Sequence, residues 1–237
     1  GTPDGQYFLD LYSIQEAVLQ FLLQNPNTHT NVIMSASSLI ARIFKVSFSK
    51  DMRYRKYLST MSPFFNSSLF AQKVGLDIMT EIVTQMNQYL PSLETKTLHR
   101  SSCAIFRDII NLPLMKQALS YLPPPPPPGE SITLTPELIC LSASSLHLIN
   151  AIMSFDYSGC QSDGANEEIE LIQLPSEWSD TICQVFILYQ LLALVQNDVL
   201  APLASETLLL FTAIRRSLFV SVEATLSYYE VMQHCFL

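Results

Sequence analysis

The side chains that could do acid–base, nucleophilic or metal chemistry are few and scattered along the chain. The four histidines stand far apart, and none lies in a recognisable nucleophile or metal motif: His29, His99, His147 and His234. The carboxylates of Glu167, Glu168 and Glu170 are close enough in sequence for paired acid–base work, but the surrounding Ser, Gly, Asp and Glu favour a solvated loop. No Walker loop and no GxSxG, GxGxxG or HExxH motif occurs. We therefore expect a protein that is not an enzyme and that needs no cofactor or metal.

The cysteines also give no sign of a metal site. The chain has 5 of them, widely spaced, without a CxxC pair or a cysteine–histidine cluster. Neither a zinc site nor a disulfide framework is indicated, and most of them read best as small core residues of an intracellular protein. The sequence starts GTPDGQYF, without Met or a signal-peptide pattern, so we expect the native chain to begin upstream.

Two short stretches carry charges that require partners, because an arginine keeps its charge inside a protein and is rarely buried alone. In AIFRD, Arg107 and Asp108 follow an apolar anchor, and in AIRRSLF, Arg215 and Arg216 close an apolar helical pattern. The forked guanidinium group can bridge carboxylates bidentately, and helical repeat proteins use such bridges between repeats. We interpret these four residues as inter-repeat contacts, with contact to a partner protein as the alternative.

Composition and charge exclude several kinds of partner. Hydrophobic residues make up 49% of the chain, charged residues only 14%, and the net charge is −8. The longest apolar stretch, Val185–Val195, is shorter than the ~20 residues that span a bilayer, so we expect no membrane insertion. The chain lacks the basic face of a nucleic-acid-binding protein, so direct binding to DNA or RNA is not expected. An acidic surface suits a basic protein partner.

Helix-period apolar patterning dominates, and strand-like alternation is nearly absent. The pattern predicts about nine helices, over Tyr7–Leu23, Thr30–Lys45, Met52–Met61, Asn66–Leu90, the region near Asp108–Tyr121, Thr135–Ser154, Ser176–Gln196, Leu203–Phe219 and Ser221–Leu237. Residues 91–103 are expected to form a polar connection. Helix pairs of about 40 residues are typical of HEAT or armadillo arrays, in which each pair buries its apolar face on its neighbours. We expect an all-α fold: one superhelical α-solenoid of HEAT repeats over 1–237, with stacked antiparallel helix pairs.

Two interruptions and one aromatic residue stand out. Residues 123–129 are six prolines and a glycine, which we interpret as a polyproline insert that spaces two helices, with an SH3- or WW-type ligand as the alternative. Residues 158–170 are expected to form an acidic loop. Trp178, the only tryptophan, lies at a helix start in LPSEWSD and is interpreted as an anchor between neighbouring repeats.

The order of several motifs resembles a known family. The segment 148–219 reads LINAIMSFDYSG, then the acidic loop, QLPSEWSD and LFTAIRRSLF; upstream stand HRSSCAIFRDIINLPLMKQAL and a helix pair with IQEAVLQFLLQNPNTHTNVIMSASSLIARIFKVSF. This order and spacing resembles the importin-β superfamily of nuclear transport receptors, and within it the Ran-binding exportins of the seventh type. The polyproline run is a departure from the family pattern. By this comparison the chain would begin after the first two repeats and stop near the seventh.

The resemblance implies a receptor built of HEAT repeats that binds the GTP form of the Ran GTPase on its inner helices. It also implies protein cargo, phenylalanine-glycine repeats of nucleoporins as partners, and shuttling between nucleus and cytoplasm. No Ran-contacting residue is carried over from the family.

From the residues themselves, the polar stripes on the second helix of each pair are the candidates for partner contact: Asn31, Ser38, Arg42, Lys73, Asp77 and Glu81. Asp77 and Glu81 stand one helical turn apart and would present two carboxylates to a basic patch. The alternative function is a HEAT-repeat scaffold that organises another complex without Ran, and the alternative role of each stripe is a solvated helix face.

Overall fold

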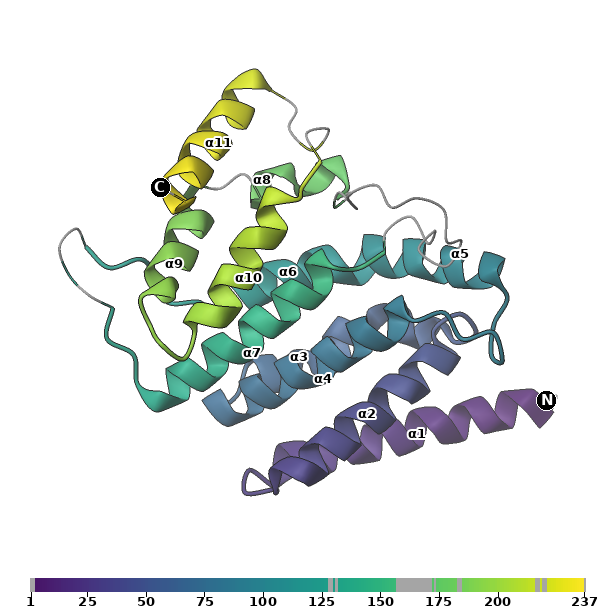
Figure 1. Ribbon diagram of the computed structural model, residues 1–237. Coiled ribbons are helices and arrows are strands. Elements are labelled where there is room, and N and C mark those ends of the chain that lie inside the picture. Colours follow the sequence, from purple (N-terminus) through teal and green to yellow (C-terminus); the bar gives the residue numbers. More distant parts are fainter. Residues whose placement is uncertain are drawn as a thin grey trace. The chain divides into compact units, whose positions relative to one another are not determined.

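The computed structural model describes residues 3–127, 130, 132–156, 172, 174–182, 185–215, 218 and 221–236. In this part of the chain the regular structure is helical, and one isolated bridge between Ile172 and Ile214 is its only strand-type pairing. Within each of two compact units, helices pack on one another as in an α-solenoid, so the expected all-α fold class is confirmed (Figure 1). The acidic loop expected over 158–170 lies outside the described residues. The chain divides into two compact units, Gly1–Asn111 and Leu112–Leu237.

The first unit is built from two antiparallel helix pairs and one further helix (Figure 1). Its elements are α1 (Pro3–Gln24), α2 (Thr30–Ser47), the 3-10 helix η1 (Met52–Lys56), α3 (Tyr57–Phe65), α4 (Leu69–Asn87), α5 (Lys96–Phe106) and the π-helical turn η2 (Arg107–Asn111). α1 packs on α2, α3 packs on α4, and α2 packs along α4. The second helices of the two pairs are therefore neighbours.

The prediction of a polar connection over residues 91–103 is wrong, because α5 occupies residues 96–103 of that segment. Thr95 begins the helix, its side chain accepting a hydrogen bond from the Leu98 amide at 3.2 Å. The buried positions of α5 have helical spacing: His99, Ser102, Cys103 and Phe106. Only Phe106 is a large hydrocarbon, so a search for apolar periodicity does not find this helix.

The core of the first unit is an aromatic cluster centred on Phe44 of α2, which is fully buried. Its ring centroid lies 4.9 Å from that of Tyr57, 5.5 Å from Tyr54 and 5.8 Å from Phe106, each pair packed edge to face. Such pairs contribute roughly 0.5–1.5 kcal/mol each beyond their buried area. Burial raises the pKa of Tyr54 to about 12, so its hydroxyl stays protonated at neutral pH. The cluster ties α2 to η1, α3 and α5.

α3 and α4 approach closely at Gly75, where a Cβ would lie 2.9 Å from Cβ of Phe64. We expect Gly75→Ala to lower the free energy of unfolding by about 1–2 kcal/mol. Rotation of the side chain cannot move Phe64 Cβ away, so the cost lies in the upper part of the usual overpacking range, about 2–3 kcal/mol, and the better helix propensity of alanine returns about 1. Urea denaturation measures the loss. Thr84→Ala, at an exposed position of the same helix, is the control and should change stability by less than about 0.5 kcal/mol. Equal stability of Gly75→Ala and the parent chain would contradict the close approach.

The second unit is built from α-helices that pack in pairs. Its elements are α6 (Leu112–Leu119), α7 (Pro136–Met153), the 3-10 helix η4 (Ser176–Trp178), α8 (Ser179–Ile182), α9 (Val185–Val195), α10 (Ala201–Thr212) and α11 (Val222–Phe236). α7 packs on α6 and α10, and α9 packs on α10 and α11. Buried hydrogen bonds join the layers: Ser145 Oγ donates to the Ala118 carbonyl at 2.6 Å, and Thr207 Oγ1 donates to Asn150 Oδ1 at 2.6 Å.

By length and composition alone, α7 is the one described helix that could cross a membrane, and two bent helix pairs pass the same test together. Its apolar character has a structural cause within the second unit. Leu146, Leu148 and Ile149 are fully buried, and α6 and α10 pack against the helix. The contacts of α7 therefore account for its hydrophobic sequence.

Two helices expected in the second unit are shorter in the structure. In the segment 176–196, expected as one helix, the structure begins with the 3-10 turn η4 and then describes α8 and α9, while residues 183 and 184 lie outside the described residues. The helix expected to reach Phe219 ends at Thr212, because the chain then pairs with Ile172. The Ile172 amide donates to the Ala213 carbonyl at 2.9 Å, and its carbonyl accepts from the Arg215 amide at 3.0 Å. The Ala213 carbonyl and the Arg215 amide, which a longer α10 would use within the helix, are therefore bound to Ile172.

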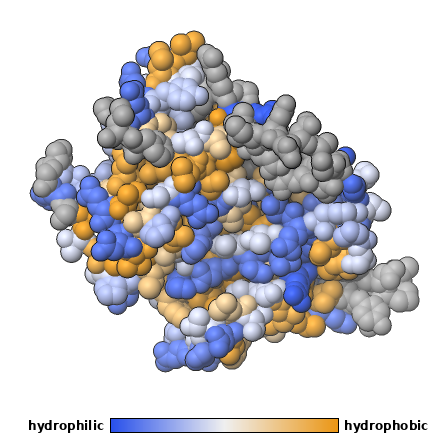
Figure 2. Space-filling view, viewed as in Figure 1, coloured by the Kyte–Doolittle hydropathy of each residue, from blue (hydrophilic) through white to orange (hydrophobic). Residues whose placement is uncertain are grey.

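Several large apolar side chains stay on the surface. On α2, Val32 and Leu39 are 47% and 44% exposed. On α11, the exposed side chains of Val222, Leu226 and Tyr229 stand at helical spacing along one face. Apolar surface is visible over α9 and α11 in Figure 2. α2 and α11 therefore carry apolar side chains that the described residues leave uncovered.

Candidate functional site

The first polar stripe lies along α2. Asn31 and Arg42 are exposed and Ser38 is half-buried. Ile33, Ile40 and other apolar residues of α2 point into the core, so the stripe is the solvent side of an amphipathic helix. No ion pair involves Arg42 among the described residues. Its charge is available to a partner.

The second stripe lies along α4, and the structure brings two of its members together. Lys73 Nζ lies 2.6 Å from Asp77 Oδ2, with the two side chains 39% and 32% exposed. Glu81 Oε1 accepts a hydrogen bond from Gln85 Nε2 at 3.2 Å. Within the described ranges no cation lies within ion-pair distance of Glu81. Lys73 offsets the charge of Asp77, so Glu81 carries most of the uncompensated negative charge of this stripe.

The two stripes run along neighbouring helices. α2 packs along α4, and Lys45 in the last turn of α2 donates to the carbonyl of Gln88, directly after the end of α4. The carboxyl ends of the two helices therefore lie together, and the helices run parallel (Figure 1). This is the arrangement expected for the inner helices of consecutive repeats.

Lys45 stands three residues after Arg42, so helical spacing would add it to the exposed polar stripe of α2, but the structure buries it. The residue is 8% exposed. Its Nζ lies 2.7 Å from Glu94 Oε1 and 3.2 Å from His99 Nδ1, and it donates to the carbonyls of Gln88 at 2.9 Å and Met86 at 3.4 Å. The ammonium group binds the carbonyls at the end of α4, where the helix dipole favours a cation.

Sequence reasoning missed this ionic cluster of Lys45, Glu94 and His99. Glu94 precedes α5 and His99 lies in its first turns, so the cluster joins α2, the end of α4 and α5. Cys103 Sγ lies 3.6 Å from His99 Nε2, and His99 Nδ1 lies 3.1 Å from Glu94 Oε1. Cys103, His99 and Glu94 are therefore arranged like a thiol–imidazole–carboxylate triad. Cys103 is only 2% exposed, so substrates cannot reach the thiol. The cluster holds three elements together.

The residues interpreted as inter-repeat contacts are placed as follows. Arg107 Nε donates to Asp108 Oδ1 at 2.6 Å, so these neighbours pair with one another. Trp178 is 2% exposed, as an anchor requires. Arg215 is exposed and lies beyond the end of α10, not in an inner helix. Arg216 lies outside the described residues.

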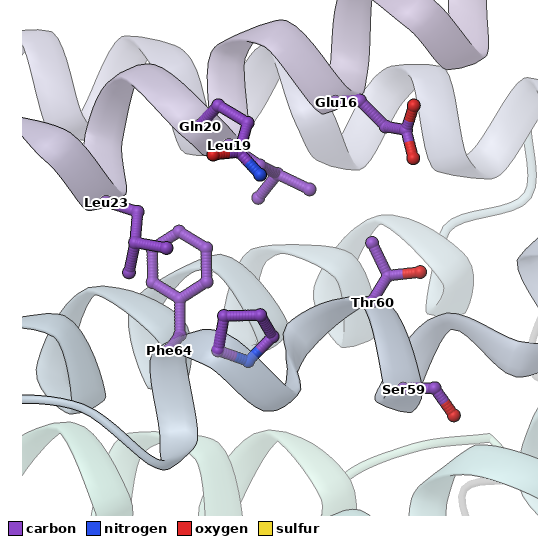
Figure 3. Close-up of a pocket in the computed structure, with 8 residues that line it drawn as sticks. Glu16, Leu19, Gln20, Leu23, Ser59, Thr60 and Phe64 are labelled. Atoms are coloured by element: carbon purple, nitrogen blue, oxygen red, sulfur yellow. The ribbon is translucent and has the colours of Figure 1, made fainter.

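A pocket opens between α1 and α3 (Figure 3). Its volume is about 330 Å³. Apolar side chains from both helices meet in it, and polar side chains complete its lining; the residues are Glu16, Leu19, Gln20, Leu23, Ser59, Thr60, Pro63 and Phe64. Leu23 and Phe64 lie at one end in Figure 3, and Glu16 and Ser59 lie at the other. The pocket is large enough to receive an aromatic side chain.

Comparison with known proteins finds relatives that are similar to this chain over nearly its whole length. It is 26% identical over 225 residues to Ran-binding protein 16 of Drosophila melanogaster, 25% identical over 228 residues to Exportin-7-B of Xenopus laevis, and 24% identical over 223 residues to human Ran-binding protein 17. These matches cover 89–90% of the chain and 20% of each relative. No family model and no solved structure matches. The chain is thus similar over nearly its whole length to exportin-7 and to Ran-binding proteins 16 and 17, the relatives that the order of its motifs indicates.

Proposed function

We propose that this chain is part of a nuclear transport receptor that binds Ran in its GTP form and carries protein cargo between nucleus and cytoplasm. The observation that carries the proposal is the similarity to Ran-binding proteins 16 and 17 and to exportin-7 over nine-tenths of the chain. The chain spans about a fifth of the length of these relatives. We further propose that its two units are consecutive parts of one HEAT-repeat array.

The Ran-binding surface we propose is the pair of polar stripes on α2 and α4. Arg42 and Glu81 have no ion-pair partner among the described residues. Charges of both signs on neighbouring parallel helices give a partner a defined register.

The test is a titration of the whole protein with Ran loaded separately with a non-hydrolysable GTP analogue and with GDP. Binding to the GTP form alone supports a transport receptor. Equal binding to both forms, or none to either, contradicts it and supports the alternative, a HEAT-repeat scaffold for another complex.

The charge of the second unit favours a basic partner. Residues 112–237 contain three Lys or Arg and thirteen Asp or Glu. A surface of one sign steers an oppositely charged protein toward it and is screened by salt. We infer that basic cargo docks on this unit, and its association rate should fall steeply between low and physiological ionic strength.

The pocket between α1 and α3 is the site we propose for phenylalanine-glycine repeats of nucleoporins. Burying one phenylalanine side chain stabilises a complex by about 1.5–3 kcal/mol, which suits weak contacts made many times. We expect Leu23→Asp to weaken retention on a phenylalanine-glycine repeat column several-fold, because it places a charge in the apolar wall of the pocket. Gln20→Ala, at a polar position of the same pocket, is the control. Equal retention of both variants and the parent protein would exclude this pocket.

A further inference from the structure

The proline run after α6 presents one regular face. Proline fixes φ and disfavours the α region for the residue before it, so consecutive prolines adopt a polyproline-II helix with three residues per turn. Among the described prolines of this run, Pro124 and Pro127 are exposed, and Pro123, Pro125 and Pro126 are half-buried. Exposure thus repeats every three residues, and the two exposed rings share one face.

The start of the run is fixed to the second unit, and a local hydrogen bond lies at its other end. Leu122, directly before it, is 5% exposed, and Gln190 Nε2 of α9 donates to the Pro123 carbonyl at 3.4 Å. At the other end, the Glu130 amide donates to the Pro127 carbonyl at 3.0 Å. A segment that is anchored at its start and whose φ angles are fixed by proline rings loses less entropy when a partner binds.

The backbone of the run still has acceptors to offer. Prolines have no N–H, and in the described part of the chain the carbonyls of Pro124, Pro125 and Pro126 accept no hydrogen bond. Domains that recognise polyproline helices place the exposed rings in an aromatic-lined groove and donate hydrogen bonds to these carbonyls. A connection that only spaces α6 from α7 requires no such face.

We propose that the face formed by Pro124 and Pro127 binds a polyproline-recognising domain of the WW type. Two features of the chain select this class. SH3 ligands commonly add a basic side chain, and the sequence contains no Lys or Arg between Lys116 and Arg215. EVH1 ligands add an apolar residue directly before the prolines, and here that residue, Leu122, is buried. Grooves of all three classes receive the proline rings, and the WW class is the one that needs neither addition. This partner is independent of Ran.

The experiment uses an isolated, isotope-labelled WW domain of the class selected for polyproline peptides. The whole protein is added, and chemical shifts of the groove residues are followed by NMR. We expect saturable binding that weakens at least tenfold in the double variant Pro124→Ala/Pro127→Ala. The control, Pro125→Ala, alters a half-buried ring and should weaken binding less than threefold. All variants are checked for unchanged circular dichroism and melting temperature.

A synthetic peptide of residues 120–131 shows whether the proline sequence itself binds the domain, and comparison with the whole protein shows whether the run is accessible in the fold. Binding of the whole protein at least as tight as that of the peptide supports the proposal. Binding of the peptide alone overturns it, because the run would then be inaccessible in the fold. Equal weakening by the double variant and the control also overturns it, as does saturable binding to an SH3 or EVH1 domain in place of the WW domain.

Discussion

Lys45→Ala should destabilise the first unit on the order of 3–5 kcal/mol, the largest effect that we expect for a single substitution. Its ammonium group contacts the Glu94 carboxylate and the carbonyls of Gln88 and Met86. Removing it leaves a carboxylate that is only 10% exposed without its cation, and leaves the Gln88 carbonyl without a donor. Urea denaturation followed by circular dichroism measures the loss.

The matched control is Lys73→Ala, which also removes a lysine from an ion pair but at a surface position. Its partner Asp77 is 32% exposed, so water replaces the lost contact and the cost should stay within about 1 kcal/mol. Amide hydrogen exchange locates the effect. In Lys45→Ala, protection should fall first in α5 and in the connection before it. Equal stability losses in the two variants would contradict a buried cluster that holds α5 in place.

The helical pattern in the sequence predicted most of the elements of this fold. Amphipathic helices such as α2 bury a regular apolar stripe, and that stripe is visible in a sequence because hydrocarbon side chains repeat at the helical period. Side-chain caps mark the starts of α4 and α7, at Ser68 and Thr135. These signals are local, so sequence alone is enough to find them.

The features that sequence reasoning missed depend on contacts between distant segments. Lys45 occupies a polar position by pattern, but its long side chain reaches Glu94 and His99, 49 and 54 residues away along the chain. α5 has polar residues on its buried face, so it has no apolar stripe to find. α10 ends at Thr212 because Ile172 binds the backbone beyond it. Periodicity carries no information about such partners.

The candidate partner-binding residues illustrate a second limit. Their spacing predicted correctly that Asn31 and Arg42 share the exposed side of α2. The same pattern treated Asp77 and Glu81 as an equivalent carboxylate pair, whereas Lys73 binds Asp77. The i,i+4 spacing of Lys73 and Asp77 is the sequence signal that could have separated the compensated carboxylate from the one that can meet a basic partner.

Glu81→Arg should weaken binding of the whole protein to GTP-loaded Ran by at least tenfold. Reversing an uncompensated charge at an interface sets like charges against each other and costs several kcal/mol, so even partial exposure leaves a large effect. Asp77→Ala should act less, because Asp77 already pairs with Lys73. Surface plasmon resonance at two salt concentrations measures the affinity and separates association from dissociation.

The control for this prediction is Glu206→Arg, an equal charge reversal at an exposed position of α10 in the second unit. If Ran binds the stripe on α4, only Glu81→Arg weakens the complex strongly, and added salt reduces the difference between the variants. Equal weakening by both variants would assign the effect to net charge, since each adds two positive charges to an acidic chain. An unchanged affinity in Glu81→Arg, with GTP-dependent binding retained, would remove α4 from the Ran interface while leaving the receptor function in place, because that function is tested by the nucleotide alone.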